Sequence, residues 1–146
     1  MSYACPYAHR TLLVRALKGL EDAIPIVVVH PIWNVIDSSI DRRGWVFGSE
    51  KNGTDFYEGV NVSDYINHKD SLRQVYHIHN PSYEGAFSVP LLFDTKTQSI
   101  VNNNSAEIVE VRLVLNKNTR HFILFHIRIT NSNQWNSFLI DLPTDP

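Results

Sequence analysis

The chain contains a single cysteine among its 146 residues, which excludes any internal disulfide bond. Chains without disulfides are typical of reducing compartments. The longest apolar run, residues 121–129, includes two histidines and an arginine and is too short to span a bilayer. The amino terminus also lacks a basic segment followed by an apolar stretch, the pattern of a secretory signal. We therefore expect a cytoplasmic protein with no membrane partner.

The sequence has no excess of positive charge either. Its 13 lysines and arginines stand against 15 acidic residues, and the net charge of −2 offers no basic surface for nucleic acid. Hydrophobic residues make up 43% of the chain, which is enough for a buried core. The length is that of one domain.

Helical and strand-like patterns alternate along the chain and predict an α/β fold. A helix is expected first, with Gly19 near its end, and a β-branched strand bounded by prolines follows it. The expected elements are a helix over 6–20, a strand over 24–29, a long loop over 31–69, a short helix over 70–77, strands over 86–94 and 99–102 joined by a turn, and a helix from Ser105 to about residue 115.

The cysteine stands where a helix is expected to begin. Cys5 is followed by Pro6, and proline suits the first helical position because its missing N–H has no partner there anyway. Cys5 would then be the N-cap, where free backbone N–H groups and the helix dipole favour a thiolate. His9 and Arg10 add positive charge one turn later. The alternative is a buried, inert cysteine.

Several motifs resemble the glutathionyl-hydroquinone reductases, which are the omega-like or xi-class glutathione transferases. Those proteins carry CPWAHR where this chain has CPYAHR, and they also share the helix ending near KGLED and the strand ending in VVHP. The resemblance covers about residues 2–110. Its later parts lie, in the same order, in residues 44–47, 72–76, 80–85, 87–94 and 100–108.

The resemblance implies a thioredoxin-like half of a glutathione transferase over residues 1–111. Such domains begin with a strand leading into the cysteine loop, and here only four residues precede Cys5. The all-helical second domain of the family is also not expected, because residues 112–146 match nothing in it. This tail predicts a strand over 122–129 and a loop over 131–136. It is either the product of a shifted reading frame or read-through intron, or a strand that replaces the first one.

The resemblance also implies a one-cysteine reaction. The Cys5 thiolate would attack a glutathionyl-hydroquinone and form a mixed disulfide, which a second glutathione, the co-substrate, would release. The partners are then small glutathione conjugates. Tyr7 stands where the family often has tryptophan and would keep an aromatic wall of the substrate pocket beside the sulfur.

The glutathione-binding residues implied by the family are named here by their positions in this chain. Val89 and Pro90 would form a cis-proline turn whose backbone pairs with glutathione; the alternative is an ordinary edge-strand proline. Asn104 and Ser105 would hold the γ-glutamyl end, although the family has glutamate at the first of these positions. The loss of that charge would cost about 1–2 kcal/mol, or roughly 5- to 30-fold in affinity.

Trp45 would pack against glutathione or the aromatic substrate, or else serve as a core or surface aromatic. Arg73, with Arg43 as a weaker candidate, would bind the glycyl carboxylate of glutathione, unless these arginines are simply solvated.

A second hypothesis is a truncated, inactive relative that acts at most as a glutathione- or protein-binding module. The missing first strand, the missing helical domain and Asn104 favour it.

Family members are commonly dimers, so a homodimer is one expected assembly. His77 and His79 lack a third clustered ligand, and no metal site is expected there. His30 precedes a proline at a strand end and is expected to be structural.

Overall fold

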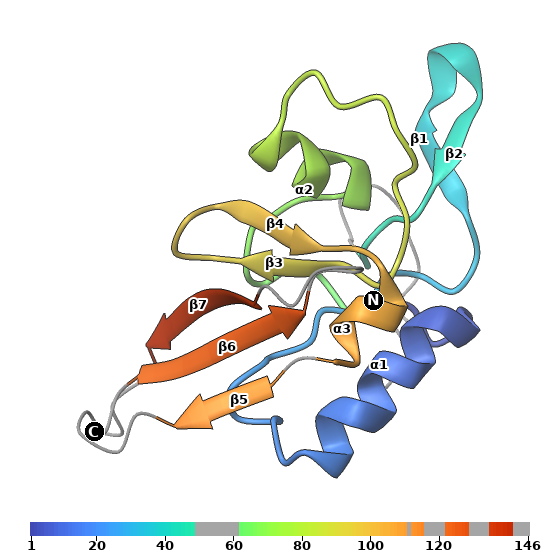
Figure 1. Cartoon of the computed structure of the whole chain (residues 1–146). Coiled ribbons are helices and arrows are strands. Elements are labelled where there is room, and N and C mark those ends of the chain that lie inside the picture. Colours follow the sequence, from blue (N-terminus) through green and yellow to red (C-terminus); the bar gives the residue numbers. More distant parts are fainter. Residues whose placement is uncertain (49–61, 111, 116–121, 129–134, 142–146) are drawn as a thin grey trace.

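The computed structural model describes residues 1–48, 62–110, 112–115, 122–128 and 135–141 (Figure 1). Within these residues the strands form three separate small antiparallel sheets. The sheets pair β1 with β2, β3 with β4, and β6 with both β5 and β7. In chain order the elements are α1 (Pro6–Leu17), β1 (Asn34–Asp37), a 3-10 turn (Ser38–Ile40), β2 (Arg42–Gly44), α2 (Leu72–His79), β3 (Leu92–Asp94), β4 (Ser99–Asn102), α3 (Ser105–Ile108), β5 (Arg112–Leu115), β6 (Phe122–Arg128) and β7 (Trp135–Asp141).

Helix α1 begins at Pro6 as predicted and ends at Leu17, three residues earlier than expected. Gly19 adopts a left-handed φ of 61°, and the N–H groups of Gly19 and Leu20 bond back to the carbonyls of Ala16 and Arg15. This is a Schellman ending, which glycine favours because it has no Cβ. The Arg15 side chain donates to the carbonyls of Glu21 and Ile24, so it holds the returning chain against the helix.

The predicted strand over 24–29 is wrong as a sheet element, because among the described residues its backbone partner on one side is Met1 alone. The Met1 amino group donates to the Val27 carbonyl at 2.7 Å, and the Val29 N–H donates to the Met1 carbonyl at 2.9 Å. These two hydrogen bonds, on either side of Val28, form one rung of a parallel ladder. On the other side, Val28 accepts a bond from the Val62 N–H. The segment is extended, but one rung does not make a strand.

The hairpin β1–β2 lies within residues 31–69, where a structureless loop was predicted, so that prediction is wrong for this part. Asp37 makes the turn by accepting hydrogen bonds from the Ser39 N–H and hydroxyl, and Asp41 adopts a positive φ of 44°. The two strands are too short and too polar to show an alternating apolar pattern. Residues 49–61 of the predicted loop lie outside the described residues.

The second hairpin, β3–β4, confirms the predicted pairing and turn. The Asp94 carboxylate accepts hydrogen bonds from the Lys96 and Thr97 N–H groups and organises the turn. Strand β3 begins at Leu92 rather than at residue 86, because Pro90 has no N–H to donate and residues 86–91 have no assigned partner strand. Helix α2 lies close to the predicted range.

The end of the chain differs from the expectation. Helix α3 stops at Ile108, and residues 112–115, predicted as helix, form β5. The predicted tail strand is present as β6, but it pairs only with β5 and β7. In the part of the chain that the structure describes, no ladder joins β6 to β3 or to residues 24–29, so its predicted replacement of a first strand is wrong. Part of the predicted loop over 131–136 lies outside the described residues; Trp135 and Asn136 belong to β7.

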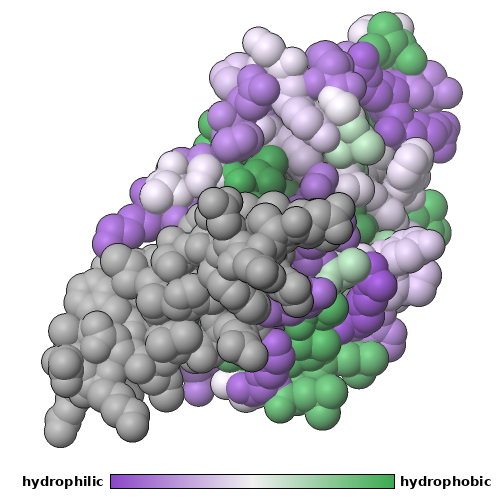
Figure 2. Space-filling model, viewed as in Figure 1, coloured by the Kyte–Doolittle hydropathy of each residue, from purple (hydrophilic) through white to green (hydrophobic). Residues whose placement is uncertain are grey.

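The core lies between α1, α2 and the segments that follow Val29 and Trp45. Its largest fully buried side chain is Tyr76, which stacks on Tyr83 and meets Phe87 edge to face. The core cluster comprises Ala8, Val29, Phe47, Leu72, Val75, Tyr76 and Val89. Apolar side chains remain exposed on α1, where Leu13 and Leu17 are 55% and 86% exposed (Figure 2).

The buried amino group of Met1 predicts a pH-dependent stability. Burial lowers the pKa of this group from 8.0 to about 5, against the opposing charge of Asp64. Between these values the unfolded chain binds a proton that the folded chain does not. The stability is therefore complete above about pH 8 and is lost as the pH falls toward about 5, by about 1.4 kcal/mol per pH unit.

We expect the free energy of unfolding in urea to fall by about 2 kcal/mol between pH 8 and pH 6, in protein whose Met1 is verified by mass spectrometry. Chain acetylated at Met1 is the control, since an amide does not titrate. An identical slope in both proteins would contradict this account.

Candidate functional site

Cys5 is the N-cap of α1, as predicted. Its backbone is extended, with φ −103° and ψ 115°, and its carbonyl accepts the His9 N–H at 2.9 Å. The side chain is half-buried and makes no capping bond to the helix. Instead the thiol donates to the Val89 carbonyl, with 3.7 Å between Sγ and O. The cysteine therefore faces a second chain segment while it stays at the positive end of the helix dipole.

The Val89–Pro90 peptide bond is cis, which confirms the prediction over its edge-strand alternative. Val89 is 7% exposed and belongs to the core cluster. Behind it, the Tyr76 hydroxyl donates to the Ser88 carbonyl at 2.9 Å and accepts from the Asn103 side chain at 3.1 Å. Tyr76 thus connects the segment that faces Cys5 with the loop that carries Asn104 and Ser105.

Ser105 lies at the start of α3 and is tied to α1. The Arg10 guanidinium donates to the Ser105 hydroxyl through both Nε, at 3.0 Å, and Nη2. Lys18, after the end of α1, bonds the Val109 carbonyl after the end of α3. The amino ends of the two helices therefore lie on the same side, which places buried Ser105 at the Cys5 end of α1. Arg10, which the sequence offered as a charge for the thiol, acts on Ser105.

Asn104 is engaged within its own loop. Its Oδ1 caps α3 by accepting the Ala106 N–H at 3.0 Å, and its Nδ2 donates to Glu107 at 2.9 Å. The other Glu107 oxygen accepts from the Asn102 side chain at 2.7 Å. A carboxylate thus lies beside the position where the family motif has glutamate. The sequence alone gave no sign of the contact between Asn104 and Glu107.

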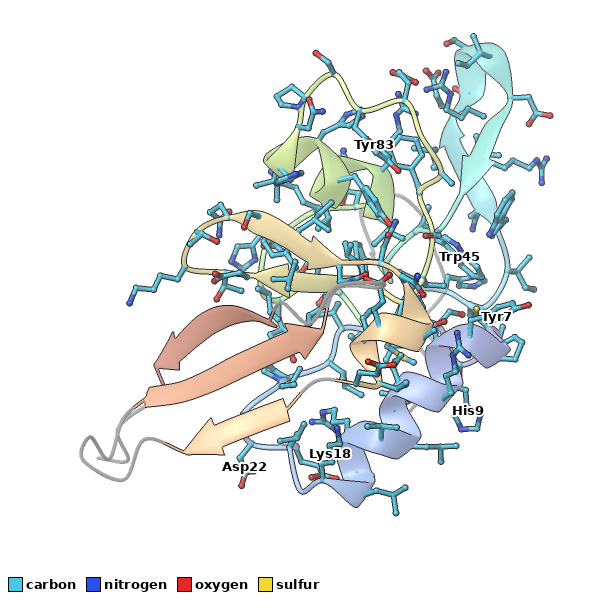
Figure 3. The ribbon with its side chains drawn as sticks, in the orientation of Figure 1. Tyr7, His9, Lys18, Asp22, Trp45 and Tyr83 are labelled. Atoms are coloured by element: carbon cyan, nitrogen blue, oxygen red, sulfur yellow. The ribbon has the colours of Figure 1, made fainter. Side chains whose placement is uncertain are left out.

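Trp45 packs against the core cluster, as does Cys5. Its indole meets Trp33 edge to face, with ring centroids 5.9 Å apart. Trp33 was missed from the sequence, because an isolated tryptophan in a loop carries no positional signal. Tyr7 is 63% exposed and lies under the Arg10 guanidinium at 5.5 Å. Figure 3 shows Tyr7 and Trp45 near the amino end of α1, with Tyr83 on the far side of Trp45.

The two candidate arginines have other partners. Arg73 forms an ion pair with Glu84 at 2.9 Å and lies over the Phe87 ring at 4.5 Å. Arg43 lies in the β1–β2 hairpin, where it pairs with Asp41 and is well exposed. The structure therefore gathers Cys5, Val89 and Trp45 around one buried cluster, brings Ser105 to the same end of α1 through Arg10, and leaves Arg43 on an exposed hairpin.

A cavity of about 650 Å³ lies between α1, residues 23–27 and residues 90–96. Met1 lines it, and Cys5 does not. The cavity adjoins the single rung at Met1 rather than the thiol.

His30 is buried and bonds the Ile32 backbone, which supports its predicted structural role. Across the described residues, no group of three His, Cys, Asp or Glu side chains could hold a metal ion. None of the described helices is long and apolar enough to cross a membrane.

Residues 4–111 match the family model described as "Glutathione S-transferase, N-terminal domain". Among curated proteins, the chain is 43% identical over 112 residues to glutathione S-transferase omega-like 2 of Schizosaccharomyces pombe. It is 39% identical over 111 residues to the glutathionyl-hydroquinone reductase YqjG of Escherichia coli. Each alignment covers 76% of this chain, but only 31% and 30% of the relative. The chain thus spans about a third of the length of the relatives it matches.

Solved structures of glutathione transferases are also similar to this chain. The glutathione transferase Xi 1 of Trametes versicolor superposes with a TM-score of 0.62 at 41% identity, over 75% of this chain and 33% of that one. The glutathione-bound structure of YqjG from Escherichia coli gives 0.61 at 38% identity, over 75% and 31%. The chain therefore resembles these two proteins in sequence as well as in fold.

Removal of the Tyr76 hydroxyl tests whether it supports the site from behind. In Tyr76→Phe the Ser88 carbonyl and the Asn103 amide each lose a partly buried partner. We expect the free energy of unfolding to fall by about 1–2 kcal/mol. Tyr83→Phe is the matched control, because its hydroxyl makes one exposed bond to the Ala86 carbonyl. Equal losses in the two variants, measured by urea unfolding, would contradict the supporting role.

Proposed function

Because the chain belongs to the glutathione S-transferase family and has the thioredoxin-like fold of its amino-terminal domain, we propose that it is a glutathione-dependent thiol oxidoreductase that reduces glutathionyl-hydroquinones through Cys5. One observation carries the proposal. The only thiol of the chain caps a helix and lies 3.7 Å from the carbonyl of Val89, the residue before the cis proline. We assign this chemistry to residues 1–111 and none of it to 112–146.

The reaction needs one cysteine and two glutathione molecules. The Cys5 thiolate attacks the thioether sulfur of the conjugate, so a sulfur–sulfur bond forms and the sulfur–carbon bond breaks. The electron pair of the broken bond stays on the ring carbon, which takes a proton and becomes the C–H of the free hydroquinone. A second glutathione thiolate attacks the mixed disulfide, releases glutathione disulfide and restores the Cys5 thiolate. The ring carbon gains two electrons, and the two glutathione sulfurs, one from the conjugate and one from the second glutathione, lose one each.

Backbone and side-chain groups near the thiol suit a peptide such as glutathione. The segment at Val89 would pair with the cysteinyl part of glutathione in the manner of an added strand. Ser105, held by Arg10, would contact the γ-glutamyl end. Trp45 would cover the ligand from its place against the core. Arg73 would bind the glycyl carboxylate with the guanidinium donors that Glu84 does not use.

The alternative is a relative that binds glutathione or a protein without turnover. It is favoured by Asn104, whose side chain is neutral and already serves as the α3 cap. If glutathione binds weakly, the mixed disulfide between Cys5 and glutathione would form slowly. The two functions share the site and differ in whether Cys5 forms and releases a mixed disulfide.

Modification of Cys5 distinguishes them. We expect native protein at pH 7 to react with iodoacetamide faster than the same protein unfolded in urea, because the helix end favours the thiolate. Glutathione disulfide should add one glutathione per chain, visible by mass spectrometry, and reduced glutathione should remove it. Cys5→Ser is the blank. An alkylation rate equal to that of the unfolded chain, with no adduct, would refute the enzyme.

The charge at position 104 supplies a further test. Asn104→Glu restores the charge of the family motif but places it against Glu107, which Asn104 now contacts at 2.9 Å. We therefore expect the Asn104→Glu/Glu107→Gln variant to bind glutathione about 5- to 30-fold more tightly than the unsubstituted chain. Glu107→Gln alone is the control. Calorimetric affinities that do not differ between the control and the double variant would show that residue 104 does not contact the ligand.

A further inference from the structure

Ile32 and Trp33 form an exposed apolar pair beside the candidate site. They are 64% and 55% exposed, although both are large and apolar. Single exposed apolar residues are common on soluble proteins and need no explanation. Here, however, the exposed tryptophan contacts a second tryptophan, Trp45, which itself packs against the same buried cluster as Cys5.

The two tryptophans face each other across the base of a hairpin. Asn34 pairs with Gly44 in the β1–β2 ladder, so positions 33 and 45 are the next opposed pair. Directly opposed side chains on antiparallel strands contact one another, and aromatic pairs at such positions are stabilising. The contact is edge to face, with an interplanar angle of 81°. This arrangement holds Trp33 in place while more than half of its surface stays open to a ligand.

His30 fixes the start of this segment. The ring Nδ1 of His30 lies 3.1 Å from the Ile32 N–H nitrogen and 2.9 Å from the Ile32 carbonyl oxygen. The backbone N–H of His30 donates to the Val46 carbonyl at 2.7 Å. The imidazole is 5% exposed. The turn that presents Ile32 and Trp33 is thereby attached to the segment that carries Trp45.

The parallel rung at Met1 joins the segment that leads to Cys5 to the segment that leads to Trp33. Met1 bonds both Val27 and Val29, so the two segments leave the rung in the same direction. Cys5 follows four residues after Met1, and Trp33 follows four residues after Val29. Trp33 contacts Trp45, and Figure 3 shows Trp45 and Tyr7 near the amino end of α1, which Cys5 caps.

We propose that Trp33, held edge to face by Trp45, is the specificity-determining surface against which the aromatic ring of a glutathione conjugate stacks while Cys5 attacks its sulfur. This proposal rests on the proposed function. A planar hydroxylated ring has the shape and polarity for the open indole surface, and its hydroxyl groups can remain in water. Aliphatic glutathione adducts cannot use the same contact.

The first experiment measures ring binding without chemistry. In the Cys5→Ser background, 1-naphthol is titrated against the protein and its affinity is measured by equilibrium dialysis. Trp33→Ala is expected to weaken binding about tenfold, and Trp33→Phe less than about threefold, because a stacking surface remains. Ile40→Ala is the control, since Ile40 is also an exposed apolar residue, 58% exposed, on the same hairpin region but at its tip. Equal affinity in Trp33→Ala, or an equal loss in Ile40→Ala, would overturn the proposal.

A second experiment separates this proposal from the proposed function. Turnover of a glutathionyl-naphthohydroquinone is compared with that of the mixed disulfide of glutathione and 2-mercaptoethanol. Trp33→Ala should lower the ratio of the two kcat/KM values about tenfold, chiefly through KM for the aromatic substrate. An unchanged ratio would overturn the role of Trp33. No turnover of either substrate by the unsubstituted chain would refute the enzyme, whereas the naphthol result would still decide the ring-binding surface.

Discussion

The single parallel rung between Met1 and the Val27–Val29 backbone is the contact on which the rest of the site depends. It places the amino end of the chain beside Val29 at the centre of the fold (Figure 1). The loop from Ser2 to Cys5 then leads directly into α1. The rung also explains why a buried amino group, which is costly to keep out of water, is present: its hydrogen bond to Val27 forms part of the ladder. The thiol and the aromatic pair are then held by their own contacts, with Val89 for Cys5 and with Trp45 for Trp33.

The chemistry of the site comes from contacts between segments that are distant in the sequence. The Cys5 thiol meets the Val89 carbonyl across 84 positions, and Arg10 meets Ser105 across 95. Tyr76 holds the two partner segments in relation to each other from within the core. The site departs from the family motif at Asn104, yet a carboxylate, Glu107, lies next to it. The side chain at position 104 is neutral, and the Glu107 carboxylate that it contacts supplies a negative charge in the same loop.

Local signals in the sequence were sufficient for the beginning of α1, the β3–β4 hairpin and the approximate place of α2. Cys-Pro predicts a helix start, and Asp94 organises a turn with polar neighbours. The cis bond before Pro90 followed from the family motif, which a single X-Pro pair would not have indicated. The features that the sequence did not predict share one physical cause. Their structure depends on contacts with residues that are distant in the sequence. Residues 24–29 have strand composition but only one ladder rung, the β1–β2 strands have no apolar alternation, and Trp33 is defined by its contact with Trp45.

The proposed function requires Cys5, Val89, Trp45 and Ser105 to form one glutathione site. Titration of glutathione into 15N-labelled Cys5→Ser protein tests it most directly, because the amide and indole signals report each position separately without any reaction. We expect the amides of Val89 and Ser105 and the Trp45 indole to shift together along one saturation curve, while Ile40 at the hairpin tip stays unchanged. Signals that do not move, or that move with unrelated affinities at the different positions, would contradict a single site.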